Sequence, residues 1–145
     1  MRKFTQRFKP PSLVEIRRNR KYGKRSRAVH ATRDIKRGRI IESCPVIRMY
    51  ADDVYDDENR SLPTISWYCF HWHEGDGLDY TALALGYGSL YNHSNAPNAK
   101  FEYVNRDCLR FRALRDIKKG EEITIHYQQH DKTIEVEFSK TGISQ

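Results

Sequence analysis

The sequence predicts a mainly β protein, built from several small sheets with few short helices. Apolar and polar residues alternate over short stretches, and β-branched and aromatic residues gather between turn residues. The 3.6-residue repeat of an amphipathic helix is weak almost everywhere. Two alternating stretches also flank the turn Asn-Arg-Asp at residues 105–107, which is the pattern of a β-hairpin.

Length and composition indicate one folded domain. The chain has 145 residues, of which 38% are hydrophobic, 31% charged and 12% aromatic. These values are typical of a soluble domain and not of a disordered chain. No apolar run approaches the ~20 residues that cross a bilayer, and no apolar stretch follows the charged N-terminus. We therefore expect an intracellular protein with no membrane partner.

The cysteines and histidines predict neither a disulfide framework nor a metal site. Cys44, Cys69 and Cys108 are odd in number and widely spaced, so we expect reduced thiols. His71 and His73 flank a tryptophan, but no third ligand follows at a recognisable spacing. We expect them to be surface residues of a strand.

The expected elements follow one another at short intervals. The basic residues 1–12, which contain a proline pair, predict an ill-ordered arm. Strands are expected over residues 13–18 and, after Gly38, over residues 39–49. The polar residues 20–27 predict a loop between them.

The expected elements after residue 50 are turns, an aromatic segment, a hairpin and a last strand. Residues 51–60 are acidic and predict an exposed turn or the start of a short helix. The aromatic residues 64–72 predict a buried segment, and the two glycines of residues 73–79 predict a turn. Residues 99–104 and 108–114 form the predicted hairpin. A last strand is expected over residues 121–127, with Ile123, Ile125 and Tyr127 on one face.

One stretch of sequence occurs twice. Residues 31–41 read ATRDIKRGRII and residues 113–123 read ALRDIKKGEEI. The expected meaning is a reused turn in which glycine adopts a positive φ before a strand begins. The repeat is too short to predict a repeat architecture.

Charge divides the chain into a basic segment and an acidic body. Residues 1–39 carry a net charge of +13 and residues 40–145 carry −6. The basic segment predicts a contact with nucleic acid or nucleoprotein through phosphates, although it lacks stacking aromatics and a recognition-helix pattern. The acidic residues 52–58 either attract a Lys/Arg-rich protein tail or form a solvated loop that keeps the surface soluble.

The segment LYNHSNAPNA, residues 90–99, places polar residues directly after an apolar and tyrosine-rich stretch. Pro97 and Asn98 are typical of a turn that directs the chain away. Asn92 and His93 have two open interpretations, as an Asx turn and a core histidine or as ligands of a bound molecule. Glycosylation at Asn92 would require a secreted protein, which the composition argues against.

Three segments together resemble the SET-domain family of protein-lysine methyltransferases: ATRDIKRGRII, ALGYGSLYNHSNAPNA and ALRDIKKGEEITIHY. The motif NHSxxPN is moderately specific and GEEITxxY is weakly specific, but the two at a distance of about 28 residues are strongly specific. The chain is similar to the minimal, stand-alone SET domains of bacteria, archaea and large viruses. The resemblance implies an arm over residues 1–12, a SET domain over 13–130 and a C-terminal extension over 131–145 that packs on or near the cofactor site.

The resemblance also implies a fold and an activity. The fold is the SET-domain fold (β-clip), in which small sheets surround a C-terminal pseudoknot. The activity is transfer of methyl groups from S-adenosylmethionine (SAM) to the lysine amine of a basic, histone-like protein, and pairing into a homodimer is a further expectation. The alternative is a catalytically weak module that binds nucleic acid or a protein partner through its basic N-terminal segment.

Methyl transfer to an amine depends mainly on alignment and on a neutral lysine, whose free pKa is about 10.4. A narrow apolar channel lowers that pKa. By the resemblance, Tyr127 is the catalytic residue that orients the amine, and Tyr87 and Tyr91 line the substrate channel. The implied cofactor-binding residues are Arg27, Ala28, Tyr68, Asn92, His93 and Tyr127.

Two stretches depart from the family pattern. Ser26-Arg27-Ala28 replaces a Gly-x-Gly that lets the backbone approach SAM closely. Either the loop reaches the cofactor with an altered backbone, or affinity for SAM is weakened. Gln128, Gln129 and His130 replace the Gly or Trp that often follows the tyrosine, and Phe138 is a candidate cover for the adenine.

Overall fold

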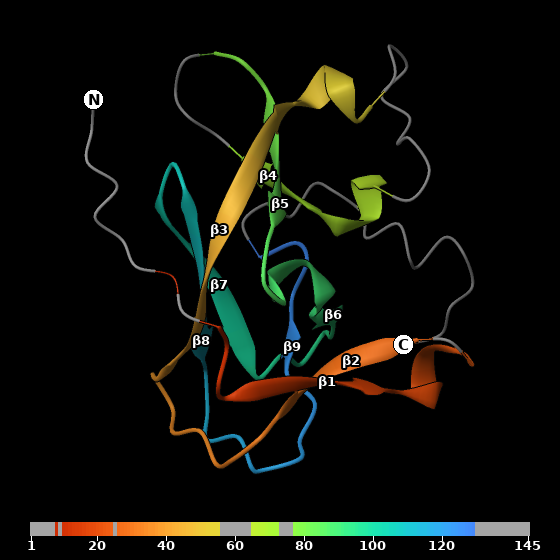
Figure 1. The fold of residues 1–145 in the computed structure, drawn as a ribbon, viewed down its shortest axis with the longest axis vertical. Coiled ribbons are helices and arrows are strands. Elements are labelled where there is room, and N and C mark those ends of the chain that lie inside the picture. Colours follow the sequence, from red (N-terminus) through yellow and green to blue (C-terminus); the bar gives the residue numbers. More distant parts are fainter. Residues whose placement is uncertain (1–7, 9, 25, 56–64, 73–76, 130–145) are drawn as a thin grey trace.

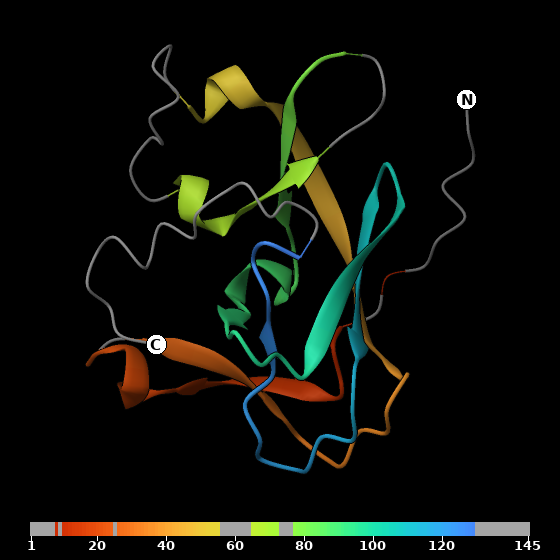
Figure 2. The ribbon, with the colours of Figure 1, turned by 180° about the vertical axis from the view of Figure 1, so that it is seen from behind.

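The computed structural model describes residues 8, 10–24, 26–55, 65–72 and 77–129, and these form three sheets (Figures 1 and 2). Helical structure in these ranges is limited to the 3-10 turns η1 (Arg20–Tyr22), η2 (Ala51–Asp53), η3 (Ile65–Tyr68) and η4 (Gly88–Leu90). The strands are β1 (Val14–Arg18), β2 (Arg27–Ala31), β3 (Ile40–Tyr50), β4 (Cys69–Trp72), β5 (Tyr80–Ala84), β6 (Asn92–His93), β7 (Ala99–Asn105), β8 (Cys108–Ala113) and β9 (Thr124–Ile125). The prediction of a mainly β fold is confirmed.

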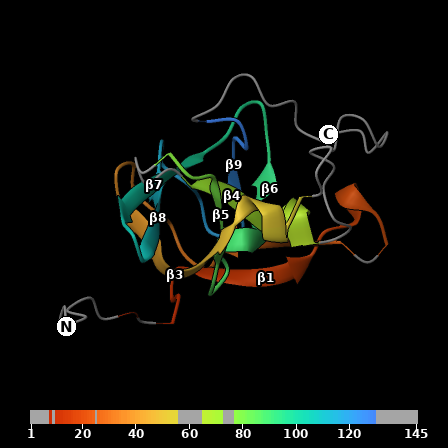
Figure 3. The same ribbon diagram turned by 90° about the horizontal axis from the view of Figure 1, so that it is seen from above.

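The largest sheet has the strand order β4-β5-β3-β8-β7. The long strand β3 lies in its middle because its first half pairs with β8 and its second half with β5, both antiparallel. In β8 the buried residues Leu109, Phe111 and Ala113 alternate with Arg110 and Arg112. This alternation turns one face of the sheet toward the core. Seen from above, the sheet curls around that core (Figure 3).

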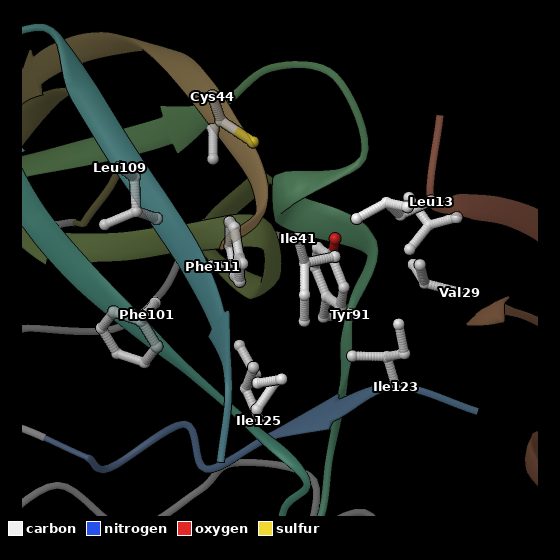
Figure 4. Close-up of a cluster of buried hydrophobic side chains, with 14 of the residues drawn as sticks. Leu13, Val29, Ile41, Cys44, Tyr91, Phe101, Leu109, Phe111, Ile123 and Ile125 are labelled. Carbon is white, nitrogen blue, oxygen red and sulfur yellow. The ribbon is translucent and has the colours of Figure 1, made fainter. Parts of the chain in front are cut away.

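The core brings β3, β8 and the segment before β6 together (Figure 4). The ring of Tyr91 stacks on Phe111 with centroids 4.3 Å apart. At Gly88 in η4, a Cβ would lie 2.7 Å from Ala84 Cβ and 2.8 Å from Cys44 Sγ. Only glycine therefore allows η4 to pack this closely against the sheet. This contact fixes the chain just before Asn92.

The two copies of the repeated sequence contact each other. We call residues 32–39 and 114–121 the paired turns. Ile35 N donates to Ile117 O and Ile117 N donates to Ile35 O, both at 2.8 Å. Gly38 and Gly120 adopt φ values of 82° and 85°, so the prediction of a reused turn with positive-φ glycine is confirmed.

The repeat extends beyond the turns, which the sequence does not predict. Each turn follows an antiparallel hairpin, β1–β2 or β7–β8, and leads into residues that pair with the other hairpin. After the first turn Ile40 pairs with Arg112 of β8, and after the second Glu122 pairs with His30 of β2. The segments that follow the two turns thus cross to the opposite hairpins in a pseudo-two-fold arrangement, in which β3 forms a ladder with β8 and Glu122 forms a single bridge to β2.

Most predicted elements are present, with two differences. The strands expected over 13–18 and 39–49 and the hairpin are confirmed by β1, β3, β7 and β8. The strands β2, β5 and β6 are additional to those predicted, and the last predicted strand is reduced to β9. The acidic segment begins with η2, in which Asp52 and Asp53 are exposed.

Several predictions fall wholly or partly outside the described residues. These are most of the arm over residues 1–12, the acidic residues 56–58, His73 and the extension over 131–145. In the part of the chain that the structure describes, no helix is long and apolar enough to cross a membrane. No cluster of three or more His, Cys, Asp or Glu side chains in that part could hold a metal ion. All three cysteines are free thiols, and Cys44 and Cys108 are buried.

Candidate functional site

The candidate site is built on a parallel pairing between β6 and β9. Asn92 lies opposite Thr124, His93 lies opposite Ile125, and Ser94 N donates to Ile125 O at 2.9 Å. We call this two-residue pairing the seam. It joins the NHS segment to the GEEIT segment, which the family resemblance implies.

The buried side chain of Asn98 holds the seam together. Its Nδ2 donates to Glu122 O at 2.8 Å, and its Oδ1 accepts a hydrogen bond from Thr124 N at 2.9 Å. Asn98 is only 3% exposed, so both bonds are shielded from water. Asn98, which the sequence predicts as part of a turn, therefore also fixes the register of β6 and β9.

His93 and Tyr91 fix the two ends of Tyr127. Tyr127 N donates to His93 Nδ1 at 3.0 Å, and the Tyr127 hydroxyl donates to the Tyr91 carbonyl at 2.9 Å. Because Nδ1 accepts, the proton of the neutral ring lies on Nε2, which is 3.0 Å from Asn95 Oδ1. Burial lowers the pKa of His93, and this favours the same neutral form.

A pocket of about 360 Å³ opens beside Tyr127. Its volume is within the range of small-molecule sites in proteins. The residues that line it come from β2 and the residue before it, from η3, η4 and β6, and from the segment after β9. The lining residues are Ser26, Arg27, Trp67, Tyr68, Ser89, Leu90, Asn92 and Tyr127.

The amide of Asn92 is oriented by the hydrogen bonds that its nitrogen donates. Nδ2 lies 3.1 Å from both Arg27 O and Glu122 Oε1. The Glu122 carboxylate also accepts from the Tyr22 hydroxyl at 2.9 Å and from Asn19 Nδ2 at 3.0 Å. None of the described residues donates a hydrogen bond to Asn92 Oδ1. This oxygen is therefore available to a ligand.

Tyr127 is a neutral phenol over the physiological pH range. Burial is the main cause that raises its pKa well above the usual value of about 10. The phenol is therefore a hydrogen-bonding group and not a base. Since its O–H points toward the Tyr91 carbonyl, the lone pairs of its oxygen face other directions.

The structure brings four of the six proposed cofactor residues to the pocket, namely Arg27, Tyr68, Asn92 and Tyr127. Ala28 is fully buried and does not line the pocket. His93 does not line the pocket. It contacts Tyr127, with the two ring centroids 5.2 Å apart, and accepts the hydrogen bond from Tyr127 N.

Neither of the two proposed channel residues lines the pocket. Tyr91 is 2% exposed, and its hydroxyl donates to Glu42 Oε1 at 2.6 Å within the core. Its side chain therefore contacts Phe111 and Glu42, and its carbonyl accepts the hydrogen bond from the Tyr127 hydroxyl. Tyr87 is half-buried against the same core, and its N–H lies 3.4 Å from Glu42 Oε2. Burial raises the pKa of the Glu42 carboxyl, which these hydrogen bonds partly offset.

Sequence reasoning does not assign several residues of the site. The sequence indicates Ser26 only as a replacement for glycine, although it lines the pocket. Trp67 precedes Tyr68, and Ser89 and Leu90 precede the NHS motif, so adjacency to the proposed ligands is the available signal. Glu122 lies in the GEEI motif, but only the fold shows which groups meet its carboxylate.

Comparisons with known proteins agree with this geometry. The family model of the SET domain matches residues 26–128. A histone-lysine N-methyltransferase of Schizosaccharomyces pombe, specific for H3 lysine-37, is 33% identical over 120 residues, which are 82% of this chain and 76% of the relative. A crystal structure of a Plasmodium falciparum protein assigned as a histone methyltransferase superposes with a TM-score of 0.63 at 29% identity, over 87% of this chain and 99% of that chain. The chain therefore belongs to the SET-domain family.

Proposed function

We propose that this SET-domain protein is a SAM-dependent protein-lysine methyltransferase that acts on a histone-like, basic protein. The observation that supports this most directly is the meeting of Asn92 and Tyr127 in one pocket beside the seam. Residues from distant parts of the chain converge there around a tyrosine held at both ends. The family match and the methyltransferase relatives point to the same activity.

The pocket residues suit the chemical groups of SAM. When bound, SAM supplies an activated methyl group on a positively charged sulfonium. The exposed guanidinium of Arg27 suits the cofactor carboxylate, and the available Oδ1 of Asn92 suits its ammonium group. The aromatic rings of Trp67 and Tyr68 suit a flat base and a cation. Ser26, which replaces glycine, lines the pocket without filling it.

We assign to Tyr127 the task of orienting the lysine amine. Its hydroxyl is fixed on the Tyr91 carbonyl, so its oxygen keeps one position and needs no rearrangement during the reaction. Since burial keeps the phenol neutral, Tyr127 does not remove the lysine proton. The amine would instead reach its neutral form in apolar surroundings, which lower the pKa of a lysine.

The substrate class follows from charge and from the relatives. Exposed Asp52 and Asp53 in η2 carry part of the acidic run that would attract a Lys/Arg-rich tail. A histone is the substrate named for the fission yeast relative. The second candidate function, a catalytically weak binding module, rests on the basic segment over residues 1–39.

Transfer of labelled methyl groups from SAM into a mixture of basic proteins tests the proposal. We expect Tyr127→Phe to lower kcat by about 100-fold, because it removes a fixed polar group at the reacting centre. Asn92→Ala should weaken SAM binding about tenfold by calorimetry. The control is Tyr103→Phe, which removes a hydroxyl bound to His71 O outside the pocket and should leave the rate unchanged.

Two results would contradict the proposal. Undiminished transfer in Tyr127→Phe would remove that residue from the reaction. Absence of both transfer and SAM binding in the unaltered protein would favour the binding module.

A further inference from the structure

The paired turns carry most of the exposed positive charge at one end of the molecule. The two turns lie side by side away from β6 (Figures 1 and 2). Residues 32–39 and 114–121 together contain seven basic and three acidic residues, which gives a net charge of +4. The acids are Asp34, Asp116 and Glu121. The bases, all exposed, are Arg33, Lys36, Arg37, Arg39, Arg115, Lys118 and Lys119.

The two aspartates lie between the turns, where each caps the opposite one. Asp34 Oδ1 accepts from Lys119 N at 2.9 Å, and Asp116 Oδ1 accepts from Arg37 N at 2.8 Å. These backbone hydrogen bonds are the main cause that lowers the pKa of both carboxyl groups. The acids therefore hold the turns together and stay ionised.

The bases differ in how they are used. Lys36 Nζ lies 3.5 Å from Asp116, Lys118 Nζ lies 3.7 Å from Asp34, and Arg115 pairs with Glu121 at 2.9 Å. Four bases have no ion-pair partner among the described residues: Arg33, Arg37, Arg39 and Lys119. Within the described residues, the surface therefore offers four positive charges that form no ion pair, on two turns joined by hydrogen bonds.

We propose that the paired turns bind the phosphate backbone of double-stranded nucleic acid. The two strands of a duplex are antiparallel and are related by two-fold axes, and the pseudo-two-fold axis of the turns relates one pair of these bases in the same way. Arg37 and Lys119 are one such equivalent pair, because each follows the lysine of its turn and each N–H meets the opposite aspartate.

The contact is to phosphates and not to bases. Among the described residues, no helix or strand projects from the paired turns that could enter a groove, and their exposed side chains are mostly charged. Affinity should therefore be independent of sequence and fall steeply with salt.

This surface is separate from the methyl-transfer pocket. None of the residues 32–39 and 114–121 lines the pocket. The proposal therefore stands or fails independently of the proposed function. If both hold, the surface would bring the enzyme to basic proteins that are themselves bound to nucleic acid.

Fluorescence anisotropy with a labelled duplex of mixed sequence tests the proposal in the full chain. The turn variant replaces Arg33, Arg37, Arg39 and Lys119 by Gln, which leaves the ion pairs and aspartate caps in place. We expect its affinity to fall at least tenfold at about 0.1 M salt. The slope of log K against log salt should fall by about 0.9 for each phosphate that the variant no longer neutralises.

A loop variant, with Arg18, Arg20, Lys21 and Lys24 replaced by Gln, is the matched control. It removes the same charge elsewhere on the surface, and we expect its affinity to change about threefold or less. Equal weakening in both variants would show a response to net charge alone and would overturn the proposal. Salt-insensitive binding, or complete competition by polyglutamate but not by unlabelled duplex, would also overturn it.

Two further measurements keep the outcome interpretable. Thermal unfolding shows whether the turn variant is folded. If the turn variant does not fold, the milder double variant Arg37→Gln/Lys119→Gln replaces it. Because this variant removes two charges and not four, we expect its salt slope to change by about half of the amount expected for the turn variant. Methyl transfer to a free basic protein should be unchanged in either variant, since the pocket is intact.

Discussion

His93 connects the seam to the proposed catalytic tyrosine through a single ring atom. Its Nδ1 can accept the hydrogen bond from Tyr127 N only when the imidazole is neutral. The neighbouring ring of His126, with its centroid 4.7 Å away, further disfavours a charged His93. The protonation of this one residue is therefore linked to the stability of the site.

The first prediction concerns this protonation. Burial holds the pKa of folded His93 below the value near 6.5 of the unfolded chain, so the unfolded state binds the proton more readily. The stabilisation is fully present above about pH 6.5 and is lost as the pH falls through the lower folded pKa. Denaturant unfolding at several pH values should show this loss in the unaltered protein and not in His93→Gln.

The matched control is His71→Gln, because His71 lies exposed on β4. Its pH dependence should equal that of the unaltered protein. A decline below pH 6.5 of the same size in His93→Gln would assign the effect to other groups.

The strands β6 and β9 have two residues each, too few to form a stable ladder alone. Asn98 compensates by binding Glu122 O and Thr124 N, as a third strand would. A side-chain amide suits this task because it carries a donor and an acceptor. The short element that positions Asn92 and Tyr127 thus depends on a residue outside it.

We therefore predict that Asn98→Ala destabilises the fold by about 3 kcal/mol, because it leaves a buried carbonyl and a buried N–H without partners. Methyl transfer should fall together with stability. Chemical unfolding measures the loss, and Asn105→Ala, an exposed asparagine at the β7–β8 turn, should cost about 1 kcal/mol or less. A similar loss for the two variants would contradict the role assigned to Asn98.

At the scale of the whole molecule, the exchange of strands between the two hairpin units determines how the chain unfolds. The strand β3 that follows the first hairpin pairs with β8 of the second, and Glu122 after the second hairpin pairs with His30 of the first. The structure therefore has no natural boundary between an N-terminal and a C-terminal half. We expect one cooperative transition and not two.

Ile35 and Ile117 test the expectation of a single transition, because both are buried and occupy the same position in the two turns. Ile35→Val and Ile117→Val should each cost about 1 kcal/mol and leave a single transition by fluorescence and circular dichroism. Ile47→Val, at a position that is 48% exposed, should cost less than about 0.5 kcal/mol. Separate transitions in either core variant would contradict the exchange.

The sequence by itself determined the fold class, the hairpin and the family. Alternation in residues 99–114 is a local property, and the residue types of the NHS and GEEIT motifs are set by the contacts they make. The family resemblance placed Asn92 and Tyr127 in one proposed site, and the structure brings both to one pocket.

Only the tertiary structure decided the direction of side chains and the pairing of distant segments. Tyr91 belongs to an aromatic run, but its ring lies in the core because Phe111 and Glu42 meet it there. The strand β5 shows no alternation in YTALA and forms between two neighbours. The repeat looked like a turn used twice, because pairing across about 80 residues leaves no local pattern in the sequence.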